Sequence, residues 1–272
     1  MRYTEVVFQL FIPDGNNTAL VFLQEDNLGK RTIIQDLILT QYPQLHIEQV
    51  GFVTGNSEVA FLCMTGQEFC LNAVRCVAWY FLHGRPGELV VYVSGIGCRI
   101  RAGITDQLEV WSEVPVDPDL KKVRLIEPEV YLVNLSTITH LVVTKSGTQK
   151  FLCANNSLYD SAEMLLEKYQ LRKQPAAGVI FLEAAELDVR LHPYVYVKAM
   201  QTMLYETACG SGTMAAGLVM AAENRHNVEN WFIQPSQQRL RALVQMEYPY
   251  IKRACVIGTV KSDGVVNRIE IK

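Results

Sequence analysis

Two cysteines, one in each half of the chain, stand where a helix is expected to begin. Cys70 precedes the run LNAVRCVAWYFLH, and Cys209 precedes GSGTMAAGLVMAAEN. A glutamate lies shortly before each cysteine, at Glu68 and Glu206. The two cysteines are 139 positions apart in a chain of 272 residues, close to half its length. This repetition predicts an internal duplication, in which two similar domains each carry one cysteine at a helix start.

Helices and strands are expected in the same order in both halves. Apolar spacing predicts helices at 31–42 and 70–83 in the first half, and at 157–172 and 209–224 in the second. Short runs rich in β-branched and aromatic residues predict strands between them. Each half is therefore expected to contain strands, a helix, strands, a second helix and strands. This pattern is typical of an α+β fold made of two α/β domains.

A stretch containing three prolines, at 115–128, separates the two halves. We place the domain boundary near residues 116–128, because prolines interrupt regular structure and are common in connecting segments. The expected N-terminal domain covers 1–122, and the expected C-terminal domain covers 123–261.

Composition excludes several classes of protein. The chain has 25 lysines and arginines against 28 aspartates and glutamates, so there is no basic excess to drive nucleic-acid binding. No apolar run reaches about 18 residues, so no membrane span is expected. The first residues, MRYTEVVFQLF, are typical of a strand rather than a signal peptide. A cytoplasmic protein is the expectation.

The seven cysteines are irregularly spaced, and the five histidines are scattered. Neither pattern has the spacing of a zinc site, so no metal centre is expected. In a reducing compartment cysteines are free thiols, which are usually buried. Five are expected to be ordinary core thiols, all but Cys76 in or beside strands: Cys63, Cys76, Cys98, Cys153 and Cys255.

The remaining two cysteines have a chemical use at a helix start. A helix N-terminus presents unpaired N–H groups and a partial positive charge, which stabilise a thiolate. Such a position can lower a cysteine pKa from about 8.5 toward neutrality. If Cys70 and Cys209 face one substrate, a thiolate can remove a proton from carbon while the other thiol returns one on the opposite face. The product is the mirror-image centre.

At these residues the chain resembles a known family. EFCLNAVRC, paired with ETACGSGTMAAG, resembles diaminopimelate epimerase and related racemases that use two cysteines and no pyridoxal phosphate. The resemblance implies two domains related by pseudo-twofold symmetry, with the active site in the interdomain cleft. It also implies that Cys70 and Cys209 are the acid/base pair, that no cofactor is needed, and that the protein is a homodimer. A last strand at about 262–272 would pack with the first domain.

The same resemblance assigns substrate contacts. PDGN is similar to the family's N-terminal turn, whose asparagine, here Asn16, contacts substrate. The α-carboxylate would be held by backbone amides at the two helix starts, namely those of Leu71, Asn72, Gly210 and Ser211.

One branch of the family is more similar. IEQVGF, PDGNNT, GQEFCLNA and CGSGT together look like the histidine racemases that supply opine metallophore biosynthesis. The stretch QTMLYE lacks the arginine with which diaminopimelate epimerase grips a second amino-acid group. Glu48 matches a glutamate that these racemases offer to the imidazole. Leu71 departs from both groups, which have glycine there. The expected reaction is therefore interconversion of L-histidine and D-histidine.

Alternatives remain open at several residues. Asn16 could cap a turn, Glu48 could be a solvated strand residue, and Gln49 is a weaker substrate contact beside it. Glu206 could bind substrate or shape the environment of the second thiol. His140 is interpreted as structural. At the level of function, the alternatives are diaminopimelate epimerase itself and a non-catalytic amino-acid-binding protein. An isomerase of the phenazine-biosynthesis type shares the fold but lacks a two-cysteine site.

Overall fold

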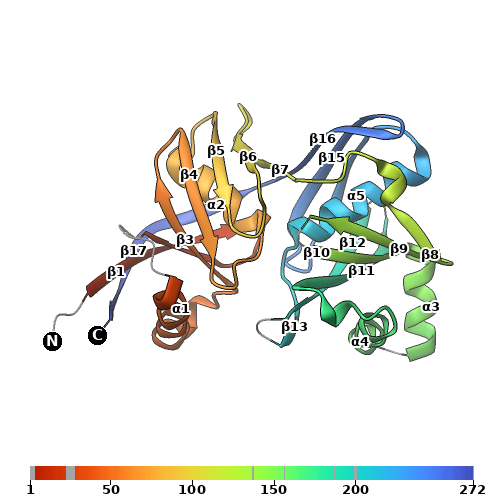
Figure 1. Cartoon of the computed structure of the whole chain (residues 1–272), viewed down its shortest axis with the longest axis horizontal. Helices are drawn as coiled ribbons and strands as arrows, with labels where there is room; N and C mark the ends of the chain where they lie inside the picture. Colours follow the sequence, from red (N-terminus) through yellow and green to blue (C-terminus); the bar gives the residue numbers. More distant parts are fainter. Residues whose placement is uncertain are drawn as a thin grey trace. The chain divides into compact units, whose positions relative to one another are not determined.

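A computed structural model describes the chain outside a few short segments. The described residues are 4–22, 28–136, 138–155, 157–186, 188–198 and 201–271. The chain divides into two compact units, the first formed by 1–112 together with 258–272 and the second by 113–257 (Figure 1). Residue 272 of the expected last strand lies outside the described residues. No helix in the described part of the chain is long and apolar enough to cross a membrane.

In its described residues, the first unit is a run of paired strands with two α-helices. The pairing order is β17, β1, β2, β3, β4, β5, β6, β7, with parallel pairs at β2–β3 and β4–β5 and antiparallel pairs elsewhere. Its elements are β1 Thr4–Pro13, β2 Thr18–Phe22, α1 Leu28–Gln41, β3 Gln49–Gly55, β4 Val59–Met64, α2 Leu71–Phe81, β5 Gly87–Val93, β6 Arg99–Ile104, β7 Val110–Glu113 and β17 Val260–Ile271.

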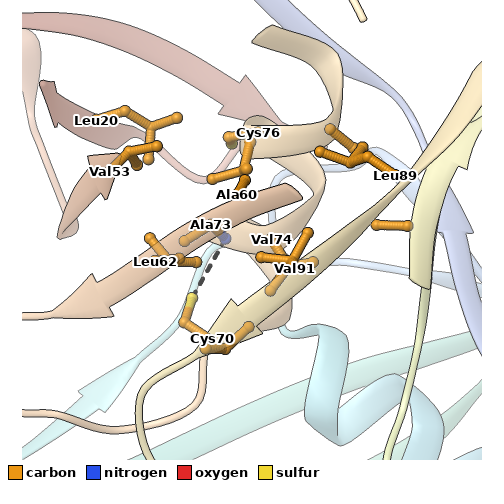
Figure 2. Close-up of a cluster of buried hydrophobic side chains, with 14 of the residues drawn as sticks. Leu20, Val53, Ala60, Leu62, Cys70, Ala73, Val74, Cys76, Leu89 and Val91 are labelled. Atoms are coloured by element: carbon orange, nitrogen blue, oxygen red, sulfur yellow. Dashed lines mark hydrogen bonds between the residues drawn. The ribbon is translucent and has the colours of Figure 1, made fainter. Parts of the chain in front are cut away.

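Helix α2 is the centre of the first unit's main core. It contacts strands β1 to β6 and β17, and the first eight of its residues are buried. Figure 2 shows the side chains of Ala73, Val74 and Cys76 among those of the surrounding strands. Helix α1 contributes Ile34 and Ile38 to a separate apolar cluster that it forms with β1, β2, β3 and β17. Because α2 is enclosed by strands, its first turn and Cys70 are fixed by the core.

The second unit has the same kind of construction. Its strands pair in the order β8, β9, β10, β11, β12, after which β12 pairs with both β13 and β14, and β14, β15 and β16 follow. Its elements are β8 Arg124–Glu127, β9 Val130–Leu135, β10 Ile138–Val143, α3 Lys145–Asn155, α4 Leu158–Lys168, β11 Ala176–Ala185, β12 Asp188–Val197, β13 Thr202–Tyr205, α5 Gly210–Asn224, β14 Val228–Ile233, β15 Arg239–Glu247 and β16 Tyr250–Gly258.

Helix α5 packs closely on the strands because its residues are small. It contacts β9 to β12 and also β14 and β15. A Cβ atom added at Gly217 would lie 2.7 Å from the Cβ of Ala242 on β15, closer than real side chains approach. Glycine at this point therefore permits the helix to approach the strand.

The four helices expected from the sequence are present, with ends that differ by a few residues. A fifth helix, α3, was not expected. Its sequence contains Ser146, Gly147 and Thr148, which are weak helix formers, so local propensity does not indicate it. It packs on α4 and β11, and this tertiary contact stabilises it.

Candidate active site

Cys70 caps helix α2 in the first unit. Its backbone is extended, with φ −129° and ψ 110°, and its sulfur accepts a hydrogen bond from the backbone N–H of Ala73 at 3.4 Å (Figure 2). The thiol in turn donates to Oε1 of Gln49 at 2.9 Å. The Cys70 residue is 8% exposed. The sulfur is therefore held at the helix N-terminus, where a negative charge is favoured.

Glu48 and Asn16 form a hydrogen-bonded group beside Gln49. Asn16 Nδ2 donates to Glu48 Oε2 at 2.9 Å, and Thr18 Oγ1 donates to Asn16 Oδ1 at 2.9 Å. The backbone N–H of Asn17 reaches the other carboxylate oxygen of Glu48 at 3.5 Å. Glu48 was expected to lie within a strand, but it immediately precedes β3. Four expected site residues, Asn16, Glu48, Gln49 and Cys70, are thus brought together within this unit.

The buried side chain of Asn72 points to an ion pair. Its Oδ1 accepts from Arg75 Nη2 at 2.9 Å, and Arg75 Nη1 lies 2.5 Å from Asp14 Oδ2. Asp14 Oδ1 accepts from the backbone N–H of Thr259 at 2.7 Å. Sequence reasoning missed Asp14 and Arg75, although a charged residue inside an apolar helix was an available signal. They join the turn before Asn16 to the first turn of α2.

Leu71 and Asn72 occupy the first two positions of α2, and both are buried. The first N–H groups of a helix have no acceptor within the helix itself. The side chain of Leu71 lies in the protein interior, so the replacement of glycine at this position is accommodated by packing.

Cys209 caps helix α5 in the second unit in the same manner as Cys70 caps α2. Its φ is −123° and its ψ is 104°, and its sulfur accepts from the backbone N–H of Gly212 at 3.3 Å. The residue is 1% exposed. A Cβ atom added at Gly212 would lie 3.1 Å from this sulfur and 2.7 Å from a side-chain carbon of Ile180. Glycine therefore allows the helix turn to close around the thiol.

A buried glutamine holds the backbone at Cys209. Gln234 Oε1 accepts from the backbone N–H of Cys209 at 3.0 Å, and its Nε2 donates to Thr213 Oγ1 at 3.1 Å. Thr213 Oγ1 also donates to the carbonyl of Cys209 at 2.7 Å. Gln234 was not identified from the sequence, because it lies 25 residues from Cys209 and belongs to no local motif.

The Ser211 hydroxyl lies between His140 and the Cys209 thiol. The Nε2 of His140 is 3.0 Å from Ser211 Oγ, which is 3.5 Å from Cys209 Sγ. Burial lowers the pKa of His140 to about 3, so the imidazole is neutral near pH 7. A Cβ atom added at Gly178 would lie 2.3 Å from His140 Nδ1, so glycine leaves the room that the ring occupies. His140 thus has a defined place next to the expected site, which its sequence position in a strand did not indicate.

The acidity of Cys209 differs from the expectation for a helix start. Burial raises the pKa of the Cys209 thiol, and the charge of Glu206 together with a hydrogen bond to it raises this pKa further. The Ser211 hydroxyl and the Gly212 N–H act in the opposite direction but are weaker. The expected lowering toward neutrality is therefore wrong for this thiol, because loss of water and a nearby carboxylate outweigh the helix N-terminus. Glu206 therefore lies close enough to the Cys209 thiol to act on it by charge and by a hydrogen bond.

The other five cysteines are less uniform than expected. Only Cys76 and Cys255 are buried, whereas Cys63 is half-buried and Cys98 and Cys153 are exposed. Cys153 lies in α3 and not in or beside a strand, which corrects the expectation. The error arises from the unexpected helix, whose outer face carries this thiol. In the described ranges no group of three or more histidine, cysteine, aspartate or glutamate residues is arranged to hold a metal ion.

The chain is similar to proteins of known activity. It is 26% identical over 219 residues to a histidine racemase of Fusobacterium nucleatum, a match that covers 75% of this chain and 77% of the relative. It is 24% identical over 233 residues to a histidine racemase of Staphylococcus aureus, covering 80% and 81% of the two chains.

The fold is also found among solved structures. A hydroxyproline epimerase from Agrobacterium vitis, solved with bound trans-4-hydroxy-L-proline, superposes with a TM-score of 0.62 at 10% identity, covering 98% of this chain and 93% of the epimerase. At 10% identity, the structural similarity to this epimerase shows a shared sheet-rich α+β fold. The family model described as the histidine racemase CntK N-terminal domain matches residues 5–265. The match covers nearly the whole chain and includes both helix-capping cysteines. This protein therefore belongs to the histidine racemase CntK family.

Proposed function

We propose that this protein interconverts L-histidine and D-histidine by two-base proton transfer at Cα, with Cys70 and Cys209 as the two bases. One observation carries the mechanism. Each cysteine caps a helix with nearly the same backbone angles, and each sulfur accepts the N–H of the residue three positions later. Family membership supports the substrate, and this repeated geometry supports the chemistry.

The two thiols have different resting roles in this proposal. The raised pKa of Cys209 keeps its sulfur protonated near pH 7, so it starts a turnover as the proton donor. Cys70 then acts as the thiolate that removes the α-proton. Its hydrogen bond to Gln49 is made by the thiol form, and a rotation of the amide by half a turn offers an N–H to the thiolate instead. The reverse reaction starts with the protons exchanged.

The substrate carboxylate is assigned to the two helix starts. Backbone N–H groups of Leu71 and Asn72 on α2, and of Gly210 and Ser211 on α5, are the donors. Removal of the α-proton places additional negative charge on the carboxylate, and fixed N–H dipoles stabilise this charge most strongly where water is excluded. The proposal requires each thiol to reach the same Cα from opposite sides, as in a pseudo-twofold arrangement of the two units.

Glu48 is assigned to the substrate imidazole. Its carboxylate is oriented by Asn16 Nδ2 and by the backbone N–H of Asn17, so one face is fixed and acceptor capacity remains. An imidazole N–H, in the neutral or the charged ring, is a good donor to a carboxylate. In this proposal Asn16 acts through Glu48, and Glu206 acts through Cys209, whose pKa it raises.

We further propose that the enzyme works as a cytoplasmic homodimer, needs no cofactor, and supplies D-histidine to opine metallophore biosynthesis. These points rest on the resemblance of the two cysteine motifs to the family. From the proline-containing middle of the chain we also propose a domain boundary near residue 122.

The decisive experiment follows deuterium incorporation at Cα in D2O without added cofactor. L-Histidine and diaminopimelate are incubated separately with the protein, and optical rotation is recorded in parallel. We expect exchange and loss of optical rotation with histidine. Exchange with diaminopimelate alone would exclude the histidine assignment. No exchange with either compound, together with measurable histidine binding, would instead identify an amino-acid-binding protein.

Two variants separate catalysis from binding. Cys70→Ser and Cys209→Ser should each abolish racemisation while histidine binding remains within a few-fold of the unmodified protein. Cys153→Ser is the matched control, because this cysteine is exposed on α3 and outside the proposed site. Full racemisation by either site variant would disprove the two-base assignment.

A further inference from the structure

A pocket of about 420 Å³ lies in the first unit, on the face of β3 to β6 beside α1. The pocket is separate from Cys70, the residue that caps α2. Leu62 belongs to the core around α2, and neighbouring strand residues point to opposite faces. Cys63 therefore faces the other side of the sheet. The lining of the pocket includes Arg31, Phe52, Cys63, Tyr92, Cys98 and Arg99.

A buried guanidinium contacts the sulfur of Cys63. Arg31 is 2% exposed, and its Nη1 donates to Cys63 Sγ at 2.6 Å. The guanidinium carbon is 5.6 Å from the centre of the Phe52 ring, which holds the cation in place. A fixed positive charge beside a sulfur favours the thiolate over the thiol. The Cys63 thiol also donates to the backbone carbonyl of Met64 at 3.5 Å. Cys63 therefore has a nucleophilic atom beside a buried cation and lines the pocket.

The charged side chains among the described lining residues of the pocket are basic. Among its described lining residues, Arg31 and Arg99 are the charged groups and none is a carboxylate. The other titratable groups in the lining are the Cys98 thiol and the Tyr92 phenol. Tyr92 stacks on Phe61 with ring centres 5.1 Å apart, and both of these lining residues are partly exposed to solvent. The pocket is thus suited to a small molecule that carries carboxylates.

Strand β5 separates the two cysteines of the pocket. Leu62 pairs with Val93 and Tyr92 pairs with Arg99, so β5 runs between Cys63 on β4 and Cys98, which immediately precedes β6. Two strand spacings amount to about 10 Å. Disulfide formation needs Cα atoms within about 7 Å. A disulfide partner for Cys63 must therefore come from solution.

We propose that Cys63 is a reactive thiolate site that undergoes thiol–disulfide exchange with small carboxylate-bearing disulfides. The thiolate attacks one sulfur of the small disulfide and forms a new S–S bond. The original S–S bond breaks, and the second half leaves as a thiolate carrying the electron pair. Cys63 is oxidised to a mixed disulfide and the released half is reduced, so no further oxidant is needed.

The first test measures the pH dependence of alkylation by iodoacetamide, resolved for each cysteine by peptide mass. Each site's rate is normalised to its own value at high pH, which removes differences in access. Cys98 in the same molecule is the internal control, because it is exposed and lines the same pocket. We expect the midpoint for Cys63 at least about one pH unit below that for Cys98. Equal midpoints, or a higher one for Cys63, would overturn the proposal.

The second test changes the cation. Arg31→Gln should move the Cys63 midpoint upward by about one pH unit or more, whereas Arg31→Lys should retain most of the difference. Both variants are compared with the parent protein by thermal unfolding. An unchanged Cys63 midpoint in a folded Arg31→Gln variant would show that the guanidinium does not stabilise the thiolate. If a variant does not fold, the comparison of Cys63 with Cys98 in the parent protein still tests the proposal.

The third test identifies the product. Incubation with oxidised glutathione near pH 7 should give one mixed disulfide, mapped to Cys63, and Cys63→Ser should prevent it. An adduct at Cys98 alone, or an internal bond between Cys63 and Cys98, would contradict the proposal. Because Cys63 is outside the proposed racemase site, these results do not depend on whether histidine is the substrate.

Discussion

The carboxylate of Asp14 lies 2.5 Å from the guanidinium of Arg75, and both side chains are almost completely buried. Asp14 has a left-handed backbone, with φ 51°, and precedes Gly15, with φ 96°. Arg75 also donates to Asn72 in the first turn of α2. One ion pair thus ties the turn that carries Asn16 to the helix that carries Cys70.

Removing one member of this pair should strongly destabilise the protein. Arg75→Met leaves the Asp14 carboxylate buried without its cation, at an expected cost of about 3–5 kcal/mol in the free energy of unfolding. Denaturant unfolding measures this loss. Lys122→Met is the matched control, since its partner Asp117 and Lys122 itself are at the surface, and it should change stability far less. Equal effects of the two substitutions would show that the buried pair has no special role.

The charge of Glu206 should control the acidity of Cys209. Glu206→Gln removes a negative charge that raises the pKa of the Cys209 thiol, so this pKa should fall. The pH profile of Cys209 alkylation, normalised to its high-pH rate, measures the shift. If the thiol takes part in racemisation, the pH profile of kcat should move in the same direction.

Glu68→Gln is the matched control for this prediction. Glu68 precedes Cys70, which caps the other helix, and burial raises the pKa of the Glu68 carboxyl group. Its substitution should leave the Cys209 profile unchanged. A shift at Cys209 that is as large in Glu68→Gln as in Glu206→Gln would point to a general change in stability instead of a local charge effect.

His140 should make the fold sensitive to mild acid. Burial lowers the pKa of His140 from its usual 6.5 to about 3, so only the unfolded chain binds a proton on this ring between these values. The stability that neutral His140 contributes is therefore complete above pH 6.5 and is lost as the pH falls toward 3. Because one proton is involved, the free energy of unfolding changes by at most about 1.4 kcal/mol per pH unit on account of this ring.

Denaturant unfolding between pH 5 and 6.5, above the range in which most carboxylates titrate, tests this prediction. His140→Asn should flatten the pH dependence of the unfolding free energy in this window. His226→Gln, at an exposed position, should leave it as it is. An unchanged slope in His140→Asn would mean that the ring is already accessible to protons in the folded state.

The close approach of α5 to β15 should not tolerate a methyl group. Gly217→Ala would gain helix propensity but place Cβ 2.7 Å from the Cβ of Ala242. Overpacking of this kind costs about 1–3 kcal/mol, so we expect net destabilisation in thermal unfolding. Gly97→Ala is the control, because an added Cβ there meets nothing within 4 Å. Stabilisation by Gly217→Ala would show that the helix can move away from the strand.

The sequence by itself determined the local features around both catalytic candidates. Each cysteine is placed at a helix start because the apolar or small-residue run that follows it predicts a helix locally. The helices 71–81 and 210–224 follow from the same spacing, and so does the repetition between halves. Helix α3 shows the limit of such signals, because weak helix formers gave no local indication of it.

Only the tertiary structure decided what surrounds the two sulfurs. Gln49 contacts Cys70 across 21 residues, and His140 contacts Ser211 across 71 residues, because strand pairing brings distant segments together. The direction of the Cys209 pKa shift was decided in the same way. A helix N-terminus is visible in sequence and lowers a thiol pKa, but burial and the position of Glu206 exist only in the folded chain, and they are the larger effects.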